Sequence, residues 1–195
     1  PVYSIDLTNK SDFEDKIIDI IDNNKIKGWI NTHYPMSKGW SKSPVSWEAM
    51  NLTLNNHLGS YIYISQLLCE NSKHPLSIIN LGSLYGSVSY DFDMYIGTNI
   101  DQPVSYPAIK SAIIQTTKMF AVKYAHMGHR LNCVSPGGVF NNHPKEFVKN
   151  YSKNTPLNRM ANVDELFSAF DYFLSDKSSY TTGQNLIIDG GYSLK

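Results

Sequence analysis

The chain has 195 residues, and its 17 lysines and arginines balance 17 aspartates and glutamates, so the formal net charge is zero. Without a basic field, binding to nucleic acid or to an anionic membrane surface is not expected as the main role. Hydrophobic residues make up 42% of the chain, which is typical of a globular protein. No apolar run reaches the roughly 18 residues that a membrane span needs.

The two cysteines, Cys69 and Cys133, both lie in apolar segments. Two cysteines are too few for a disulfide scaffold, and their spacing fits no metal site. We therefore expect reduced core cysteines, a cytoplasmic location and no bound metal. His126 and His129 lie three residues apart with no carboxylate at a useful spacing, so we expect both to be solvated side chains near a helix end.

Short apolar runs alternate with amphipathic stretches, a pattern typical of an α/β fold with a mostly parallel sheet. Strands are expected over residues 2–7, 26–30, 76–81, 130–134 and 186–188. Helices are expected over residues 47–69 and 107–127, and after the capping-box pairs Ser11–Glu14 and Asn162–Glu165. No repeat, linker or low-complexity segment divides residues 1–195, so we expect one domain.

Tyr106 and Lys110 lie four residues apart at the start of a predicted helix, so both side chains share one helical face. A nearby ammonium group stabilises a phenolate and lowers the pKa of the tyrosine towards the range in which it exchanges protons. Alone, this spacing is a weak signal, because a surface tyrosine near a surface lysine is common. The surrounding motifs make the functional interpretation stronger.

Three further blocks accompany this pair. Upstream, a predicted strand ends in Asn-Leu-Gly-Ser-Leu-Tyr-Gly over residues 80–86. Downstream, another predicted strand leads into Ser-Pro-Gly-Gly-Val over residues 135–139. The third block, Ile-Asp-Gly-Gly over residues 188–191, lies near the end of the chain. In this order the blocks resemble the short-chain dehydrogenase/reductase family over nearly the whole chain. The resemblance implies an oxidoreductase that transfers a hydride between NAD or NADP and a small polar carbonyl or alcohol. Residues 95–106 resemble reductases of bacterial surface-sugar and flagellin-glycan biosynthesis, which suggests a sugar derivative.

The resemblance also implies roles for individual residues. Ser83 would hydrogen-bond the substrate oxygen, Tyr106 would act as general acid/base, and Lys110 would lower the pKa of that tyrosine. Asn56 would support a water-mediated proton relay. The residues implied to contact the cofactor are Asp6, Asn31, Tyr106, Lys110, Pro136, Gly137 and Val139.

Two departures from the family lie beside these positions. The family's Asn-Asn-Ala-Gly loop is replaced by Asn31-Thr32-His33-Tyr34. The interval from Ser83 to Tyr106 is longer than is common, and we expect the insertion to form a loop over the substrate side.

A third difference from the family is that no Gly-x-x-x-Gly-x-Gly motif occurs in these 195 residues. The family binds the cofactor pyrophosphate with such a turn between its first strand and first helix. Because Pro1 aligns with the family's third strand, we expect a Rossmann-like, doubly wound, mostly parallel sheet that lacks the first two strands and the glycine-rich turn. Residues 2–7 would then have no strand partner, and the 195 residues alone are expected not to bind NAD or NADP measurably. The alternative is a truncated non-enzymatic homologue.

The expected partners are a small-molecule substrate and further copies of the same chain. The helices predicted over residues 47–69 and 107–127 are apolar around more of their circumference than one sheet face needs. Residues 162–175 and 186–188 form a second candidate surface. We therefore expect a homodimer or homotetramer, with no nucleic-acid or membrane partner.

Overall fold

The computed structural model describes residues 4–7, 9–35, 38–40 and 44–195. In this part of the chain, four parallel strands form one sheet in the order β1-β2-β3-β4. They are β1 (Gly28–Asn31), β2 (Ser77–Leu81), β3 (Arg130–Pro136) and β4 (Asn185–Ile188). Four of the five predicted strands are thereby confirmed, with ends that differ by one or two residues.

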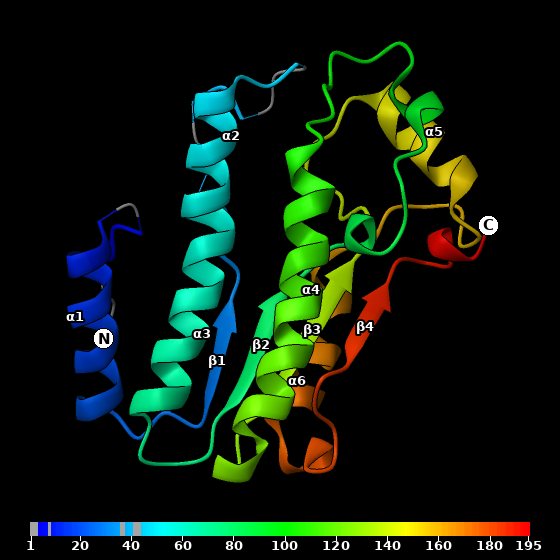
Figure 1. Ribbon diagram of the computed structural model, residues 1–195. Helices are drawn as coiled ribbons and strands as arrows, with labels where there is room; N and C mark the ends of the chain where they lie inside the picture. Colours follow the sequence, from blue (N-terminus) through cyan, green and yellow to red (C-terminus); the bar gives the residue numbers. More distant parts are fainter. Residues whose placement is uncertain (1–3, 8, 36–37, 41–43) are drawn as a thin grey trace.

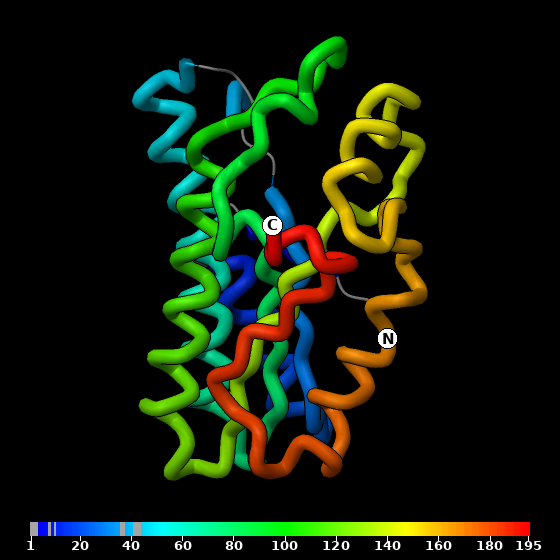
Figure 2. The backbone as a smooth tube through the Cα atoms, turned by 90° about the vertical axis from the view of Figure 1, so that its right-hand side faces the viewer, coloured from blue at the N-terminus to red at the C-terminus, as the bar shows by residue number. Residues whose placement is uncertain are grey.

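Helices cover both faces of the sheet (Figures 1 and 2). One face carries α1 (Lys10–Asn23), α3 (Ser60–Asn71) and α4 (Ser105–Tyr124), while α6 (Phe167–Leu174) covers the other. Phe173 of α6 packs on Ile79 and Val134 of the central strands, and the larger core lies between the sheet and the three helices of the first face. The doubly wound α/β fold is therefore confirmed.

The long helix predicted over residues 47–69 has three parts. A regular helix α2 (Trp47–Thr53) leads into a π-helical segment, Leu54–Gly59, and then into α3. Such wide turns occur mostly at functional sites, and this one carries Asn56. A further helix, α5 (Lys145–Asn154), was not predicted; with the segment before α4 it lies above the carboxyl ends of the strands (Figure 1).

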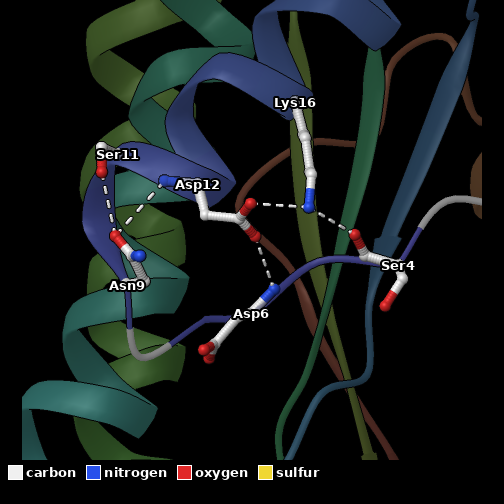
Figure 3. A network of polar contacts seen from close by, with 6 residues as sticks. All are labelled: Ser4, Asp6, Asn9, Ser11, Asp12 and Lys16. Carbon is white, nitrogen blue, oxygen red and sulfur yellow. Dashed lines mark hydrogen bonds and ion pairs between the residues drawn. The ribbon is translucent and has the colours of Figure 1, made fainter.

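The strand predicted over residues 2–7 is wrong in its described part, because residues 4–7 lie outside the sheet; residues 2 and 3 are outside the described residues. No described strand lies beside this segment to complete a ladder. Its backbone bonds instead to α1: the Asp6 N–H donates to Asp12 at 3.0 Å, and Lys16 donates to the Ser4 carbonyl at 2.8 Å (Figure 3). Ile5 packs against the core beneath α1.

One of the two predicted capping boxes is present, and one predicted solvated histidine is buried. Helix α1 starts at Lys10 with Asn9 as its N-cap, so the predicted Ser11–Glu14 capping box is wrong. The predicted Asn162–Glu165 pair is confirmed, because Glu165 accepts the Asn162 N–H at 2.8 Å. His129 is 2% exposed and accepts the Leu76 N–H at 3.0 Å, so the prediction that it is solvated is wrong. Both cysteines are buried and take part in no disulfide. None of the described helices is long and apolar enough to cross a membrane.

We expect Gly86→Ala to lower the free energy of unfolding by about 1–3 kcal/mol, the usual effect of overpacking. A Cβ at Gly86 would lie 2.9 Å from the Lys110 carbonyl carbon and 2.6 Å from Ile114, where the turn after β2 meets α4. The matched control is Gly59→Ala, whose Cβ would meet only ordinary contacts from 3.5 Å outwards, at helical φ and ψ. Urea denaturation should show the control unchanged or more stable; equal effects of the two changes would contradict the packing argument.

Candidate active site

The candidate catalytic residues meet at the carboxyl ends of β2 and β3, where ligands bind in open α/β sheets. Ser83, Tyr106, Gly137 and Val139 line one cavity of about 290 Å³. Lys110 lies one helical turn beyond Tyr106, with its ammonium group 5.8 Å from the centre of the Tyr106 ring. The structure thus brings together side chains from the turn after β2, the first turns of α4 and the turn after β3.

Ser83 follows β2 and caps the short 3-10 turn Leu84–Gly86. Its oxygen accepts the Tyr85 N–H at 3.2 Å, so the hydroxyl proton stays available for an oxygen in the cavity. The side chain is 6% exposed, which leaves it little freedom to turn away.

Tyr106 stands in the first turn of α4, with its ring edge-on to Tyr34 at 5.7 Å. Burial raises the pKa of Tyr106, and a hydrogen bond with Ser83 opposes that rise. The removal of the phenol from water is thus the largest influence on this pKa, and the lowering of the pKa by Lys110 stays a prediction. The protonated phenol is the form that donates a proton.

Lys110 is a buried cation, with 3% of its surface exposed. Its Nζ donates to the Leu81 carbonyl oxygen at 2.8 Å and lies 5.5 to 5.8 Å from the ring centres of Tyr34, Tyr61 and Tyr106. None of the ion pairs found in the described part of the chain includes it. Burial accordingly lowers the pKa of Lys110 to about 8.

Asn56 and Asn31 lie near this group but bond internally. The Asn56 carbonyl accepts the Ser60 hydroxyl at 2.6 Å, and Ser60 also contacts His33 Nε2 at 2.8 Å. Asn31, 2% exposed at the end of β1, donates to Asn80 at 2.7 Å, while its own carbonyl accepts the Tyr61 hydroxyl at 3.0 Å. Its side chain therefore fixes β1 against β2 and is not turned to a ligand.

The turn after β3 supports one wall of the cavity. Pro136 ends β3, and the Gly137 N–H donates to the Ile188 carbonyl at 2.8 Å. A Cβ at Gly137 would lie 2.8 Å from the Asp189 Cα, so the close approach of the two strand ends needs glycine. Asp6, in contrast, lies before α1 and outside the sheet, and it is not among the residues that line the cavity.

Sequence reasoning missed most of the cavity wall. Much of the lining that it missed is aromatic: Tyr34, Trp40, Tyr85, Tyr90, Tyr95, His143, Phe147 and Tyr151. The signal available was the density of aromatic residues within positions 85–95 and the Phe147–Tyr151 spacing in α5. As expected, the insertion lies on the cavity side, where Met94 is fully buried against α5.

A larger cavity of about 480 Å³ lies at the opposite, amino ends of the strands, lined by Lys27, His74 and Arg130 among others. It contains none of the candidate catalytic residues. Within the described residues, no group of three or more His, Cys, Asp or Glu side chains could hold a metal ion.

The residues fit one half of a nicotinamide dinucleotide. A buried ammonium, a serine hydroxyl and a phenol converge where a nicotinamide and its ribose could meet a substrate. Pyrophosphate binding in this fold class uses a glycine-rich turn at a helix N-terminus, and these 195 residues contain no such motif.

Lys110→Met should raise the free energy of unfolding most below pH 8. The folded-state pKa of Lys110, about 8, lies below the unfolded value of 10.5, so the native protein bears the cost of a buried charge at low pH. That cost, about 3 kcal/mol, should disappear as pH rises from about 8 to 10.5, where the unfolded state binds more protons than the native state.

The measurement is the difference in unfolding free energy between wild type and Lys110→Met at several pH values, with Lys73→Met, an exposed lysine, as control. A difference that does not shrink over this pH interval would contradict the assignment of a buried, unpaired ammonium.

Comparisons with known proteins agree with this geometry. The family model described as enoyl-(acyl carrier protein) reductase matches residues 2–193. The post-translational flagellin modification protein A of Campylobacter coli is 30% identical over 97% of this chain and 77% of its own length. D-arabinitol 2-dehydrogenase of Candida tropicalis is 34% identical over 74% of this chain, but only 52% of its own length is covered.

Among solved structures, a short-chain dehydrogenase from Leptospira borgpetersenii with bound NAD+ superimposes with a TM-score of 0.85 at 33% identity, over 98% of this chain and 74% of that one. The NADP complex of a gluconate 5-dehydrogenase from Burkholderia cenocepacia, at 19% identity and a TM-score of 0.84, shows the shared fold. The chain belongs to the short-chain dehydrogenase/reductase family of NAD(P)-dependent oxidoreductases.

Proposed function

We propose that this protein interconverts a small polar carbonyl compound and its alcohol, with Tyr106 as the proton donor and acceptor. The observation that carries the proposal is the convergence of Ser83, Tyr106 and the buried Lys110 at the carboxyl end of the sheet. The names of relatives that act on D-arabinitol and sorbose, and of one that modifies flagellin, support a sugar derivative as substrate. The comparisons lend no support to a non-enzymatic homologue.

Ser83, Tyr106 and Lys110 would each have a separate role in reduction of the carbonyl group. Ser83 donates a hydrogen bond to the substrate oxygen, and Tyr106 delivers its phenolic proton to that oxygen as negative charge develops there. When bound, NAD(P)H supplies the hydride that the carbonyl carbon accepts. Lys110 lies close enough to Tyr106 to stabilise the phenolate left behind, at low effective dielectric.

The proton on Tyr106 must be replaced after each reduction. We propose that the carbonyl of Asn56, in the π-helical segment, takes part in that path through water. It accepts the Ser60 hydroxyl, which in turn contacts His33, a residue where the family has alanine. Burial lowers the pKa of His33 to about 4, so this imidazole is neutral at physiological pH.

Tyr106→Phe should lower turnover by a factor of 10²–10⁴, the usual contribution of a general acid/base group, and should leave ligand binding nearly intact. Activity is measured by nicotinamide absorbance on this chain joined to a family N-terminal segment that supplies the first two strands and the glycine-rich turn. Tyr180→Phe, at a fully exposed tyrosine outside the cavity, is the control. More than about a tenth of wild-type turnover in Tyr106→Phe would remove this residue from the role.

The 195 residues by themselves should bind neither NAD nor NADP measurably. The residues at the cavity can contact the nicotinamide end only, and transfer of the pyrophosphate from water without replacement hydrogen bonds costs several kcal/mol. Isothermal titration of the 195-residue chain with both nucleotides is the test. A micromolar dissociation constant would show that another element replaces the glycine-rich turn.

We also propose a cytoplasmic homodimer or homotetramer. Helix α4 exposes Met119 and Val122, the latter 82% accessible, and α6 exposes Phe167. Light scattering at micromolar concentration should give twice or four times the chain mass, and Val122→Glu should shift it towards the monomer. A wild-type monomer under these conditions would contradict the proposal.

A further inference from the structure

The insertion between Ser83 and Tyr106 is held in place as a wall of the cavity. Met94, within the 3-10 turn Phe92–Tyr95, is fully buried, and its sulfur accepts the Tyr192 hydroxyl at 3.2 Å. Asn154 of α5 donates to Asp91 at 2.7 Å, and Asn150 donates to the Met94 carbonyl at 3.3 Å. Contacts from α5 and from the C-terminal segment thus fix the position of the insertion.

This wall is built of aromatic rings that pack against one another. The centre of the Tyr90 ring lies 4.5 Å from that of Tyr85 and 6.1 Å from that of Tyr95, and Tyr95 continues to Phe147 at 5.6 Å. The hydroxyls of Tyr85 and Tyr95 bond to each other at 3.1 Å. The Tyr151 hydroxyl accepts the Gly138 N–H. The hydroxyls of Tyr85, Tyr95 and Tyr151 are thus held in place by these bonds, and the wall consists mainly of aromatic rings.

The lining carries no lysine or arginine among the described residues. Lys110 is not part of the lining; its ammonium lies 5.8 Å from the centre of the Tyr106 ring and donates to the Leu81 carbonyl. His143 Nδ1 accepts the Asn141 N–H at 3.1 Å. Asp101, the one carboxylate in the lining, repels anions.

Polar groups also line the cavity. Ser83 is buried and belongs with Tyr106 to the proposed reacting group, whereas Asp101 is exposed and, with Gln102, offers a carboxylate and an amide that can bond to hydroxyl groups. The volume of about 290 Å³ is at the lower limit for small-molecule sites. A ligand that fits has aliphatic C–H faces for the aromatic wall and hydroxyls on its edge.

We infer that the substrate of the proposed reaction is an uncharged, hydroxylated ring of pyranose type, bound between the aromatic faces of the insertion and the Ser83–Tyr106 pair. This inference rests on the proposed function and narrows it. It excludes phosphorylated and nucleotide-linked sugars, because the described lining offers no cation to pair with a phosphate.

The test measures binding by saturation-transfer NMR and titration, separately from activity. The probes are the neutral methyl glycosides of glucose, galactose and mannose in pyranose form, their 6-phosphates, and 2-naphthol as an apolar ring. At least one neutral glycoside should bind at least ten times more tightly than its phosphate, with magnetisation transferred mainly to its ring C–H protons.

Variants locate the site. Tyr90→Leu should weaken binding of that glycoside by roughly two- to tenfold, the range for one aromatic contact, while Tyr180→Leu should not. Asp101→Lys should raise the affinity for the 6-phosphate at least tenfold, a result that does not depend on how the Tyr90 variant folds.

Three results would overturn the inference: tighter binding of the phosphates by wild type, binding of 2-naphthol with no glycoside bound, or no binding of any glycoside. If a neutral glycoside binds but is not turned over by the chain joined to the N-terminal segment, the proposed reaction is refuted and the inference on the ligand is supported. Turnover confined to anionic carbonyl compounds would support the proposed reaction and overturn the inference on the ligand.

Discussion

The arrangement of the site depends on one buried contact, the hydrogen bond from the Lys110 ammonium to the carbonyl oxygen of Leu81. A lysine without a carboxylate partner is expensive to bury, because its hydration is lost and only part of it is replaced. Here a backbone carbonyl at the end of β2 and three tyrosine rings replace that hydration. The contact ties the first turns of α4 to the strand end that leads into Ser83, so the proposed proton donor and the serine are held together.

A second set of buried polar contacts fixes the elements that carry this pair. Asn31 of β1 donates to Asn80 of β2 at 2.7 Å, and Asn80 donates to Thr117 of α4 at 2.9 Å. Each of these groups is satisfied within the protein, and a fully satisfied buried network makes the register of its elements specific. Asn31 thereby serves the site from a distance: it sets where β2 ends relative to α4, and its own amide is not turned towards a ligand.

Much of the fold follows from local patterns. Four strands were predictable because each is a short apolar run bounded by turn residues, and Tyr106 and Lys110 share a face because four residues make about one helical turn. Residues 4–7 do not form a strand because an apolar run becomes one only if a neighbour completes its ladder, and, as expected from the absence of the family's first two strands, none of the described strands pairs with them. The rise in the Tyr106 pKa could not be predicted from the spacing of Tyr106 and Lys110, because it comes from burial, a tertiary property.

The aromatic wall could not be predicted for a related reason. Tyr90 and Tyr95 become cavity residues only once Met94 is buried against α5 and Tyr192, contacts that join positions far apart in the chain. The substitutions His33 and Tyr34, visible in the sequence as departures from the family, acquire meaning only from their places: one beside Ser60, the other edge-on to Tyr106.

The most direct test of the account is an NMR titration of the Lys110 side chain, with the Cε carbon labelled and the signal assigned by its loss in Lys110→Met. A lysine buried without a carboxylate at the proposed proton-transfer site should titrate with a pKa near 8, well below its ordinary value of 10.5. A midpoint at or above 10 would mean that Lys110 is hydrated or ion-paired in solution, which would contradict the arrangement on which the proposed chemistry depends.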